Sequence, residues 1–217
     1  MEMEHKRQAE GGLLSANGFS REELVLASAS PRRAEILRAV GWPFEISAAD
    51  VDESLVDAEP PVAYVTRLAL AKAEAGAASH TGRLVLGADT TVVVDGEILG
   101  KPRDEEEAVW MLRRLSGRWH EVLTGVALVR RSGKEGFQKL VAYESTRVRF
   151  GRMTDEEISW HVAVGNPLDK AGAYAVQGVA ALFIEEIQGD YWNVVGLPVQ
   201  LVYKMAHEIW DKKREAV

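Results

Sequence analysis

The segment that most constrains this fold runs from Leu24 to Gly41 and reads LVLASASPRRAEILRAVG. It predicts a short buried strand, a tight Ser-x-Ser-Pro turn and a helix that starts at Pro31, with Ser30 as its N-cap. In open α/β sheets, ligands bind at the carboxyl ends of strands, which is where this helix begins. The first helical turn also offers unpaired backbone N–H groups and the positive end of the helix dipole. The segment therefore predicts an α/β fold with an anion site at the start of its first helix.

The candidate side chains of that site are Ser28, Ser30, Arg32 and Arg33. A guanidinium group matches phosphate with two parallel hydrogen bonds. The chain has a net charge of −7 and no long basic run, so nonspecific binding to nucleic acid is disfavoured. A local pair of arginines after a strand then indicates phosphate binding. The alternative is a capped helix that carries surface arginines.

The composition excludes several classes of protein. The chain lacks cysteine, which excludes disulfides, zinc–thiolate centres and thiol nucleophiles. No apolar stretch approaches the roughly 18 to 20 residues that cross a bilayer, so we expect no membrane partner. Residues 1–20 are rich in Gly, Ser and charge and lack the apolar segment of a secretory signal. We therefore expect a flexible extension over 1–20, a single domain over 21–217 and a cytoplasmic location.

Strands and helices are intermixed along the rest of the chain. Strands are predicted at 25–27, 44–47, 84–87, 91–94, 97–99, 121–130, 139–150 and 181–187. Helices are predicted from Pro31 to Gly41, from Pro61 onward, after the N-cap Asp104, at 154–164 and at 197–213. Asp95-Gly96 predicts a tight hairpin, and Asp104 with Glu107 matches a capping box. This order predicts a mixed twisted sheet with helices on its faces, in two lobes around a cleft.

Asp89 and Lys101 lie on either side of the predicted hairpin. Asp89 directly follows LVLG and is predicted at the carboxyl end of a buried strand. A carboxylate there can hold a metal ion or take a proton from water; the alternative is a turn residue that bonds neighbouring N–H groups. Lys101 lies in GEILGKP, where the spacing and Pro102 exclude a phosphate-binding P-loop. Lys101 can still neutralise a phosphate, and the alternative is a solvated lysine before a turn.

An acidic loop, AADVDES at residues 48–54, contains Asp50, Asp52 and Glu53. Mg²⁺ prefers carboxylate oxygens together with water and substrate phosphate. Glu53 from this loop and Asp89 from another segment could therefore share a cation. The alternative is a loop whose acidic side chains are simply solvated.

The segment 169–178, DKAGAYAVQG, consists mostly of small residues that let a backbone approach a ligand closely. Gln177 can read a base edge with one donor and one acceptor, and the alternative is a tight packing segment. The histidines are scattered and show no metal-binding spacing.

Together these segments resemble the Maf family of nucleoside triphosphate pyrophosphatases. The blocks that carry the resemblance are LASASPRRAEILRAVG, DVDES, LALAKA, VLGADTTVVVDGEILGKPRDEEEA, LSGRWHEVLTGVAL and DKAGAYAVQGVAALFIEEIQGDYWNVVGLP. They follow one another in the family's order and cover roughly residues 24–205.

The resemblance implies an α/β fold similar to that of inosine triphosphate pyrophosphatases, with a deep cleft between two lobes. It implies an enzyme that uses Mg²⁺ or Mn²⁺ and water to split nucleoside triphosphates at the α-phosphorus into the monophosphate and pyrophosphate. The combination of SPRR, ADT and AVQG is similar to the dTTP/UTP subgroup, and modified pyrimidine nucleotides stay open as substrates. A homodimer fits the family. The alternative function is a non-catalytic nucleotide-binding regulator of cell division.

The resemblance also assigns roles to residues by position. It makes Asp89 the proton acceptor and places Glu53 and Lys101 among the polar residues of the cleft. We expect Glu53 and Lys101 as further catalytic residues and Glu53 with Asp89 as the metal ligands. The substrate-binding residues that it implies are Ser28, Ser30, Arg32, Arg33, Lys72, Thr90 and Gln177. Among these, Arg32, Thr90 and Gln177 match the positions that sort substrates within the family.

Overall fold

The computed structural model describes residues 22–132 and 136–215, so the predicted extension over 1–20 lies outside the described residues. The strands are β1 (Leu24–Leu26), β2 (Phe44–Ile46), β3 (Leu84–Val94), β4 (Glu97–Leu99), β5 (Trp119–Ser132), β6 (Gly136–Phe150) and β7 (Ile184–Gln188). The α-helices are α1 (Pro31–Ala39), α2 (Pro61–Ser79), α3 (Glu105–Leu115), α4 (Asp155–Gly165), α5 (Tyr191–Val195) and α6 (Val199–Glu215). Short 3₁₀ turns are η1 (Pro167–Asp169), η2 (Ala171–Ala173) and η3 (Val179–Leu182).

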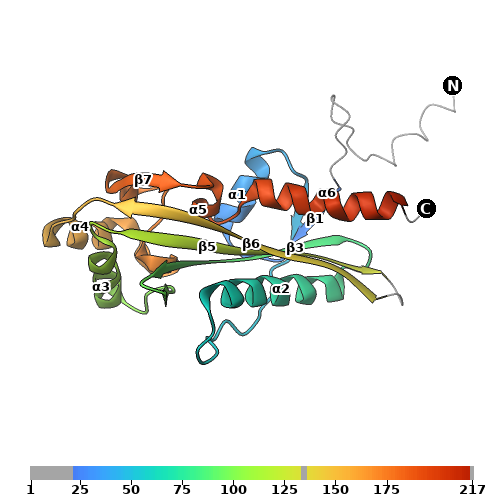
Figure 1. Cartoon of the computed structure of the whole chain (residues 1–217), viewed down its shortest axis with the longest axis horizontal. Helices are drawn as coiled ribbons and strands as arrows, with labels where there is room; N and C mark the ends of the chain where they lie inside the picture. Colours follow the sequence, from blue (N-terminus) through green and yellow to red (C-terminus); the bar gives the residue numbers. More distant parts are fainter. Residues whose placement is uncertain (1–21, 133–135, 216–217) are drawn as a thin grey trace, which may run out of the picture.

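In the described part of the chain, seven strands form one sheet in the order β2-β1-β3-β5-β6-β7, and β4 pairs with β3. β1 is parallel to β2 and β3, whereas the pairs β3–β5, β5–β6 and β6–β7 are antiparallel. Helices α1 and α6 lie over one face of the sheet and α2 lies over the other, while α3 and α4 gather at one end of the long strands (Figure 1). The predicted mixed sheet with helices on its faces is therefore confirmed.

The long strands connect two hydrophobic cores. Leu86 and Ala88 of β3 pack with α1 and α6 in the first core. Val92 of the same strand packs with α3 and α4 in the second core. The two cores correspond to the two predicted lobes, and Asp89 and Thr90 lie in β3 between them.

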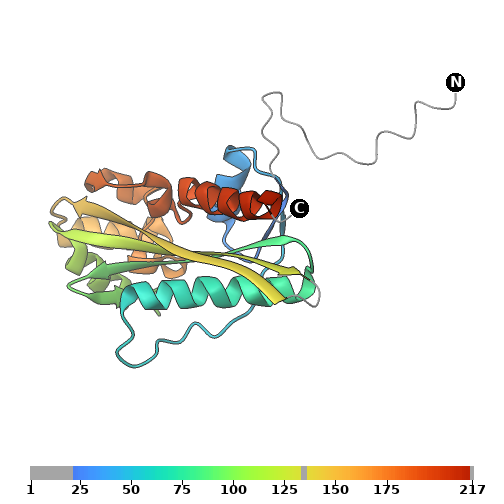
Figure 2. The ribbon, with the colours of Figure 1, turned by 45° about the vertical axis from the view of Figure 1, so that its right-hand side comes forward.

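Helix α2 lies in close contact with β3 and β5 because two facing residues are glycines. A Cβ added at Gly87 would lie 2.1 Å from the carbonyl oxygen of Ala69, and one at Gly125 would lie 2.2 Å from that of Val65. Only a residue without a side chain allows this approach of two backbones. Figure 2 shows α2 running along the long strands. The approach brings Lys72 of α2 within reach of β3.

The predicted end of a strand at Gly87 is wrong, because β3 continues to Val94 and pairs with β5 along almost its whole length. Asp89 therefore lies inside a strand. On its other side, β3 pairs with β1 over Leu84–Leu86 and with β4 over Val92–Val94. Within the described structure, residues 87–91 have no strand partner on that side, so the gap between β1 and β4 leaves an open edge beside Asp89.

The C-terminal part also differs from the prediction. Residues 179–182 form η3 rather than the start of a strand, and β7 begins at Ile184. Helix α5 was not predicted; Asp190 caps it by accepting the N–H of Trp192 at 2.7 Å. Gly196, with a φ of 127°, ends α5, so the last helix begins at Val199 and not at Leu197.

The helix caps agree with the predicted caps only in part. Asp104 accepts the N–H of Glu107 at 2.8 Å, which confirms the predicted N-cap of α3. The Glu107 carboxylate accepts from the N–H of Arg103 instead, so the predicted capping box is not formed there. A full capping box starts α4, between Thr154 and Glu157.

Candidate active site

A cavity of about 500 Å³ lies at the open edge of β3, a size typical of small-molecule sites. Its wall includes the start of α1, the two residues after β4, the segment 169–177 and the turn between α5 and α6. Every predicted site residue lines it: Ser28, Ser30, Arg32, Arg33, Glu53, Lys72, Asp89, Thr90, Lys101 and Gln177. Segments that are far apart in the sequence therefore meet where the resemblance implies a cleft.

Arg33 is a fixed cation at the base of α1. Its Nε donates to the carbonyl oxygen of Gly196 at 2.9 Å, its Nη1 to Ser28 Oγ at 2.9 Å and its Nη2 to Thr90 Oγ1 at 3.0 Å. Burial lowers the pKa of Arg33, and the nearby charge of Asp89 opposes that shift. A guanidinium stays protonated throughout the physiological range, so this buried group presents a permanent positive charge in one orientation.

The serines of the turn do not act as predicted. Ser30 occupies the N-cap position of α1, yet among the described residues its side chain caps no backbone N–H group. Ser28 Oγ instead accepts from the Ser30 N–H at 3.2 Å as well as from Arg33. The turn is thus closed by Ser28, and the side chain of Ser30 is not used as the predicted cap.

Lys72 joins the two candidate carboxylates. Its Nζ lies 2.6 Å from Glu53 Oε1 and 2.7 Å from Asp89 Oδ1. Lys72 and Asp89 are buried, whereas the side chain of Glu53 is 48% exposed. Partial burial acts to raise the pKa of Glu53, but the Lys72 hydrogen bond and the surrounding cations outweigh it and hold that pKa below its ordinary value. Both acids are therefore placed around one ammonium group.

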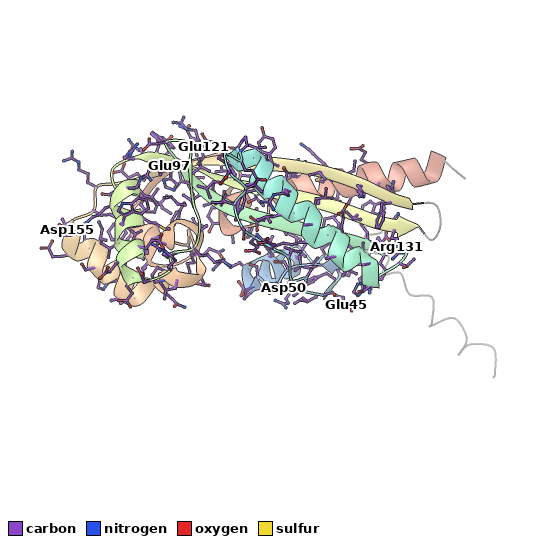
Figure 3. All side chains as sticks on the ribbon, turned by 90° about the horizontal axis from the view of Figure 1, so that it is seen from below. Glu45, Asp50, Glu97, Glu121, Arg131 and Asp155 are labelled. Carbon is purple, nitrogen blue, oxygen red and sulfur yellow. The ribbon has the colours of Figure 1, made fainter. Side chains whose placement is uncertain are left out.

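Of the described acids in the acidic loop, only Glu53 lines the cavity. Asp50 is exposed on the outside of the molecule (Figure 3). Asp52 accepts the N–H of Ser54 at 2.9 Å. For Asp50 and Asp52 the interpretation as solvated loop residues holds.

Three cavity residues come from the rim. Lys101 and Gln177 are exposed, and the charge of Lys101 acts on Glu53. Arg32 Nη1 lies 3.6 Å from Asp169 Oδ2, which links the start of α1 to the segment across the cavity.

The family model described as "Maf-like protein" matches residues 23–209. This chain belongs to the Maf family. A dTTP/UTP pyrophosphatase from Symbiobacterium thermophilum is 56% identical over 184 residues, which are 85% of this chain and 92% of that protein. A dTTP/UTP pyrophosphatase from Moorella thermoacetica is 52% identical over 195 residues, 88% of this chain and 98% of that protein. The resemblance to the Maf family is therefore confirmed.

Solved structures match the Maf chain only in part. A HAM1 protein from Coxiella burnetii is 16% identical, covers 61% of this chain and 74% of that chain, and has a TM-score of 0.42. A dITP/XTP pyrophosphatase from Mycobacterium abscessus is 20% identical, covers 60% and 75%, and has a TM-score of 0.37. The architecture given above depends on the strand order of this chain and not on these overlaps.

Glu53 and Asp89 form an incomplete donor set for a metal ion. Among the described residues, no group of three or more His, Cys, Asp or Glu side chains is placed to hold one. Mg²⁺ is usually held by one or two carboxylates together with water and substrate phosphates, and this pair fits that pattern. Two carboxylates of the Maf cavity are thus the donors available to a divalent cation.

His120 of β5 packs in the protein interior, outside the cavity wall. It is buried, its Nε2 lies 2.7 Å from the hydroxyl of Tyr174, and its ring packs edge-on against Phe150 and Tyr174. Burial lowers the pKa of His120 to about 4, so the ring is neutral at physiological pH. His120 is not among the residues that line the cavity, whereas Tyr174 is.

Sequence reasoning missed several residues of the Maf cavity. Tyr64 and Gly196 also line it, and so do Asp169 and Lys170, which belong to the predicted segment 169–178 but were given no role of their own. Tyr64 precedes Leu68 and Lys72 by four and eight positions on α2, so helical spacing could have placed it on the same face. Gly196 contributes through its carbonyl oxygen and its φ of 127°, and a backbone acceptor leaves no signal of its own in the sequence.

No helix within residues 22–132 and 136–215 combines the length and the apolar character needed to cross a membrane.

Proposed function

We propose that this chain hydrolyses dTTP and UTP to the nucleoside monophosphate and pyrophosphate. The observation that carries the proposal is the buried ammonium of Lys72 between Asp89 and Glu53, in the same cavity as the fixed guanidinium of Arg33. The relatives that are dTTP/UTP pyrophosphatases at 56% and 52% identity support the same activity.

The cationic groups of the cavity match a polyphosphate. Arg33, Lys72 and Lys101 offer positive charge, and α1 adds the positive end of its dipole. Arg33 and Lys72 are buried, and a buried charge acts more strongly on a bound anion than a charge at the surface does. We assign the phosphates to this group of residues.

Asp89 is the proposed general base. It takes a proton from a water molecule while the water oxygen bonds to the α-phosphorus. The bond from the α-phosphorus to the bridging oxygen then breaks, and the electron pair leaves with pyrophosphate, where the cations stabilise the new charge. Glu53 and Asp89 are the proposed ligands of Mg²⁺ or Mn²⁺, which when bound supplies further positive charge at the phosphate oxygens.

We assign recognition of the pyrimidine nucleobase to Arg32, Thr90 and Gln177. Thymine and uracil share a Watson–Crick edge, and the Gln177 amide offers both a donor and an acceptor to such an edge. One methyl group changes binding in a pocket only modestly, which supports acceptance of both nucleotides and of modified pyrimidine nucleotides. Thr90 Oγ1 accepts from Arg33, so Thr90 also connects this group to the phosphate side.

A non-catalytic regulator of cell division is the rival function. A protein that only binds a triphosphate gains nothing from carboxylates beside the phosphates, because like charges repel. Asp89 and Glu53 both line the cavity, which favours hydrolysis over binding alone.

A substrate panel tests the proposal. The purified full-length chain is offered dTTP, UTP, CTP, 7-methyl-GTP and dATP with Mg²⁺, and orthophosphate is measured with and without added inorganic pyrophosphatase. We expect orthophosphate from dTTP and UTP only when that coupling enzyme is present. Orthophosphate without it would contradict attack at the α-phosphorus, and nucleotide binding without product would support the regulator.

We also propose a cytoplasmic location, which the nucleotide substrate supports, and a homodimer. Cell fractionation tests the location, and light scattering on the purified chain tests the oligomeric state.

A further inference from the structure

The acidic loop is held in place by side chains from another element. Residues 47–56, all of them described, form neither helix nor strand, and the sheet holds their backbone only at the start, where the Ser47 N–H donates to the carbonyl oxygen of Leu26 at 3.0 Å. Glu53 must nevertheless bring its carboxylate to 2.6 Å from Lys72 Nζ. A long flexible segment loses conformational entropy when it is ordered in this way, so its position needs further contacts.

Two side chains of α2 bind consecutive carbonyl groups of that loop. The hydroxyl of Tyr64 donates to the carbonyl oxygen of Glu53 at 3.1 Å. Arg67 Nη2 donates to the carbonyl oxygen of Ser54 at 3.0 Å. Residues three positions apart on a helix lie on the same side of it, so Tyr64 and Arg67 can both reach the acidic loop.

Arg67 is itself oriented by a second residue. Its Nε and Nη2 bind the two carboxylate oxygens of Glu59, each at 2.7 Å, and its guanidinium lies 5.6 Å from the centre of the Tyr64 ring. A two-pronged bond of this kind fixes the plane of the guanidinium. Tyr64 and Arg67 therefore support each other as well as the loop.

The Tyr64 hydroxyl is protonated and can therefore donate a hydrogen bond. Burial, with the charges of Asp89 and Glu53 nearby, raises the pKa of Tyr64 to about 12. The hydroxyl thus keeps its proton in the range where the enzyme would work, and the Glu53 carbonyl oxygen can only accept.

We propose that Tyr64 and Arg67 are positioning residues that hold the Glu53 carboxylate against Lys72. Helix α2 then holds Glu53 twice, through its backbone carbonyl by Tyr64 and through its carboxylate by Lys72. The hydrogen bond from Arg67 to the neighbouring carbonyl of Ser54 keeps the loop from rotating about the hydrogen bond between Tyr64 and Glu53. The kinetic consequence rests on the proposed function, whereas the hold on the loop does not.

The test uses Tyr64→Phe and Arg67→Met in the full chain, with Tyr143→Phe as the matched control. Tyr143 is 49% exposed on β6, and it is not among the residues that line the cavity. We expect hydrogen–deuterium exchange in the peptides that cover residues 47–56 to speed up in both Tyr64→Phe and Arg67→Met, and to match the wild type in Tyr143→Phe. Unchanged exchange in both α2 variants overturns the proposal, whatever the activity of the chain.

The kinetic arm measures pyrophosphate release. Loss of one hydrogen bond should lower kcat on dTTP by about three- to tenfold, with a smaller change in KM. In a Glu53→Gln background, or in Glu53→Asp if the former is inactive, Tyr64→Phe should cause no further loss. An equal loss in both backgrounds, or a loss that only follows a lower melting temperature, means that Tyr64 does not act through Glu53. Absence of release from the wild-type chain would instead contradict the proposed function.

Discussion

Lys72 is the residue that links the two carboxylates of the cavity. One ammonium contacts both Glu53 and Asp89, and it is buried with Asp89. If the lysine were absent, two carboxylates would lie close together without a shared positive charge, and like charges repel. Lys72 therefore supplies the positive charge that both carboxylates share.

Asp89→Asn should abolish turnover while leaving the fold intact. Asparagine keeps an oxygen that can accept from Lys72, but it has no negative charge to take a proton. We expect kcat on dTTP to fall by at least about 100-fold, with an unchanged circular dichroism spectrum. Asp95→Asn, in the exposed hairpin turn, is the matched control and should keep its activity. Retention of turnover by Asp89→Asn would exclude Asp89 as the base.

His120 should make the stability of the protein depend on pH. Its pKa is about 4 in the folded chain and about 6.5 when exposed, so as the pH falls between these values the unfolded state binds a proton that the folded state does not. The free energy of unfolding should therefore fall by about 2 kcal/mol between pH 7 and pH 5 because of this group. Urea unfolding at both pH values measures the effect. His120→Gln should lose less on acidification, and an equal loss would contradict the assignment.

At the scale of elements, α2 organises the side of the cavity that holds Lys72, Asp89 and Glu53. It lies against β3 and β5 through Gly87 and Gly125, and it carries Tyr64, Arg67 and Lys72 toward the acidic loop. The close packing of helix on sheet, and not any one loop, thus sets the distance from Lys72 to Asp89.

Gly87→Ala should disturb this packing. The added methyl group would lie 2.1 Å from the Ala69 carbonyl oxygen, so α2 must move away from β3. We expect a loss of about 1 to 3 kcal/mol in the free energy of unfolding, together with lower pyrophosphate release. Thermal unfolding and the coupled assay measure the two effects. Gly100→Ala is the stability control, because a methyl group there meets no atom within 4 Å. Equal melting temperatures for the two variants would show that α2 does not need the glycine.

At the scale of the whole molecule, the sequence was informative about which residues meet but not about how they meet. The mixed sheet, the hairpin at Asp95-Gly96 and the helix start at Pro31 follow from local signals and are confirmed. The cavity residues came largely from the resemblance, since no local pattern reveals that Lys72 reaches Asp89. The uninterrupted course of β3 was missed. Its open edge beside Asp89 depends on where β1 ends and β4 begins, and no local pattern shows those positions. Helix α5 was missed because five residues are too short for a periodic signal.

The uninterrupted course of β3 has a consequence for how this protein tolerates insertions. Successive side chains of a strand project to opposite sides, so Asp89 meets Lys72 while Thr90 meets Arg33. A single residue inserted upstream within the strand would move the acid to the side of the guanidinium and would leave Ala88, which has no polar group, facing the ammonium. The same insertion in the turn after Val94 would leave both in place. The alternation of side chains along one strand thus decides which cation each of the two groups meets.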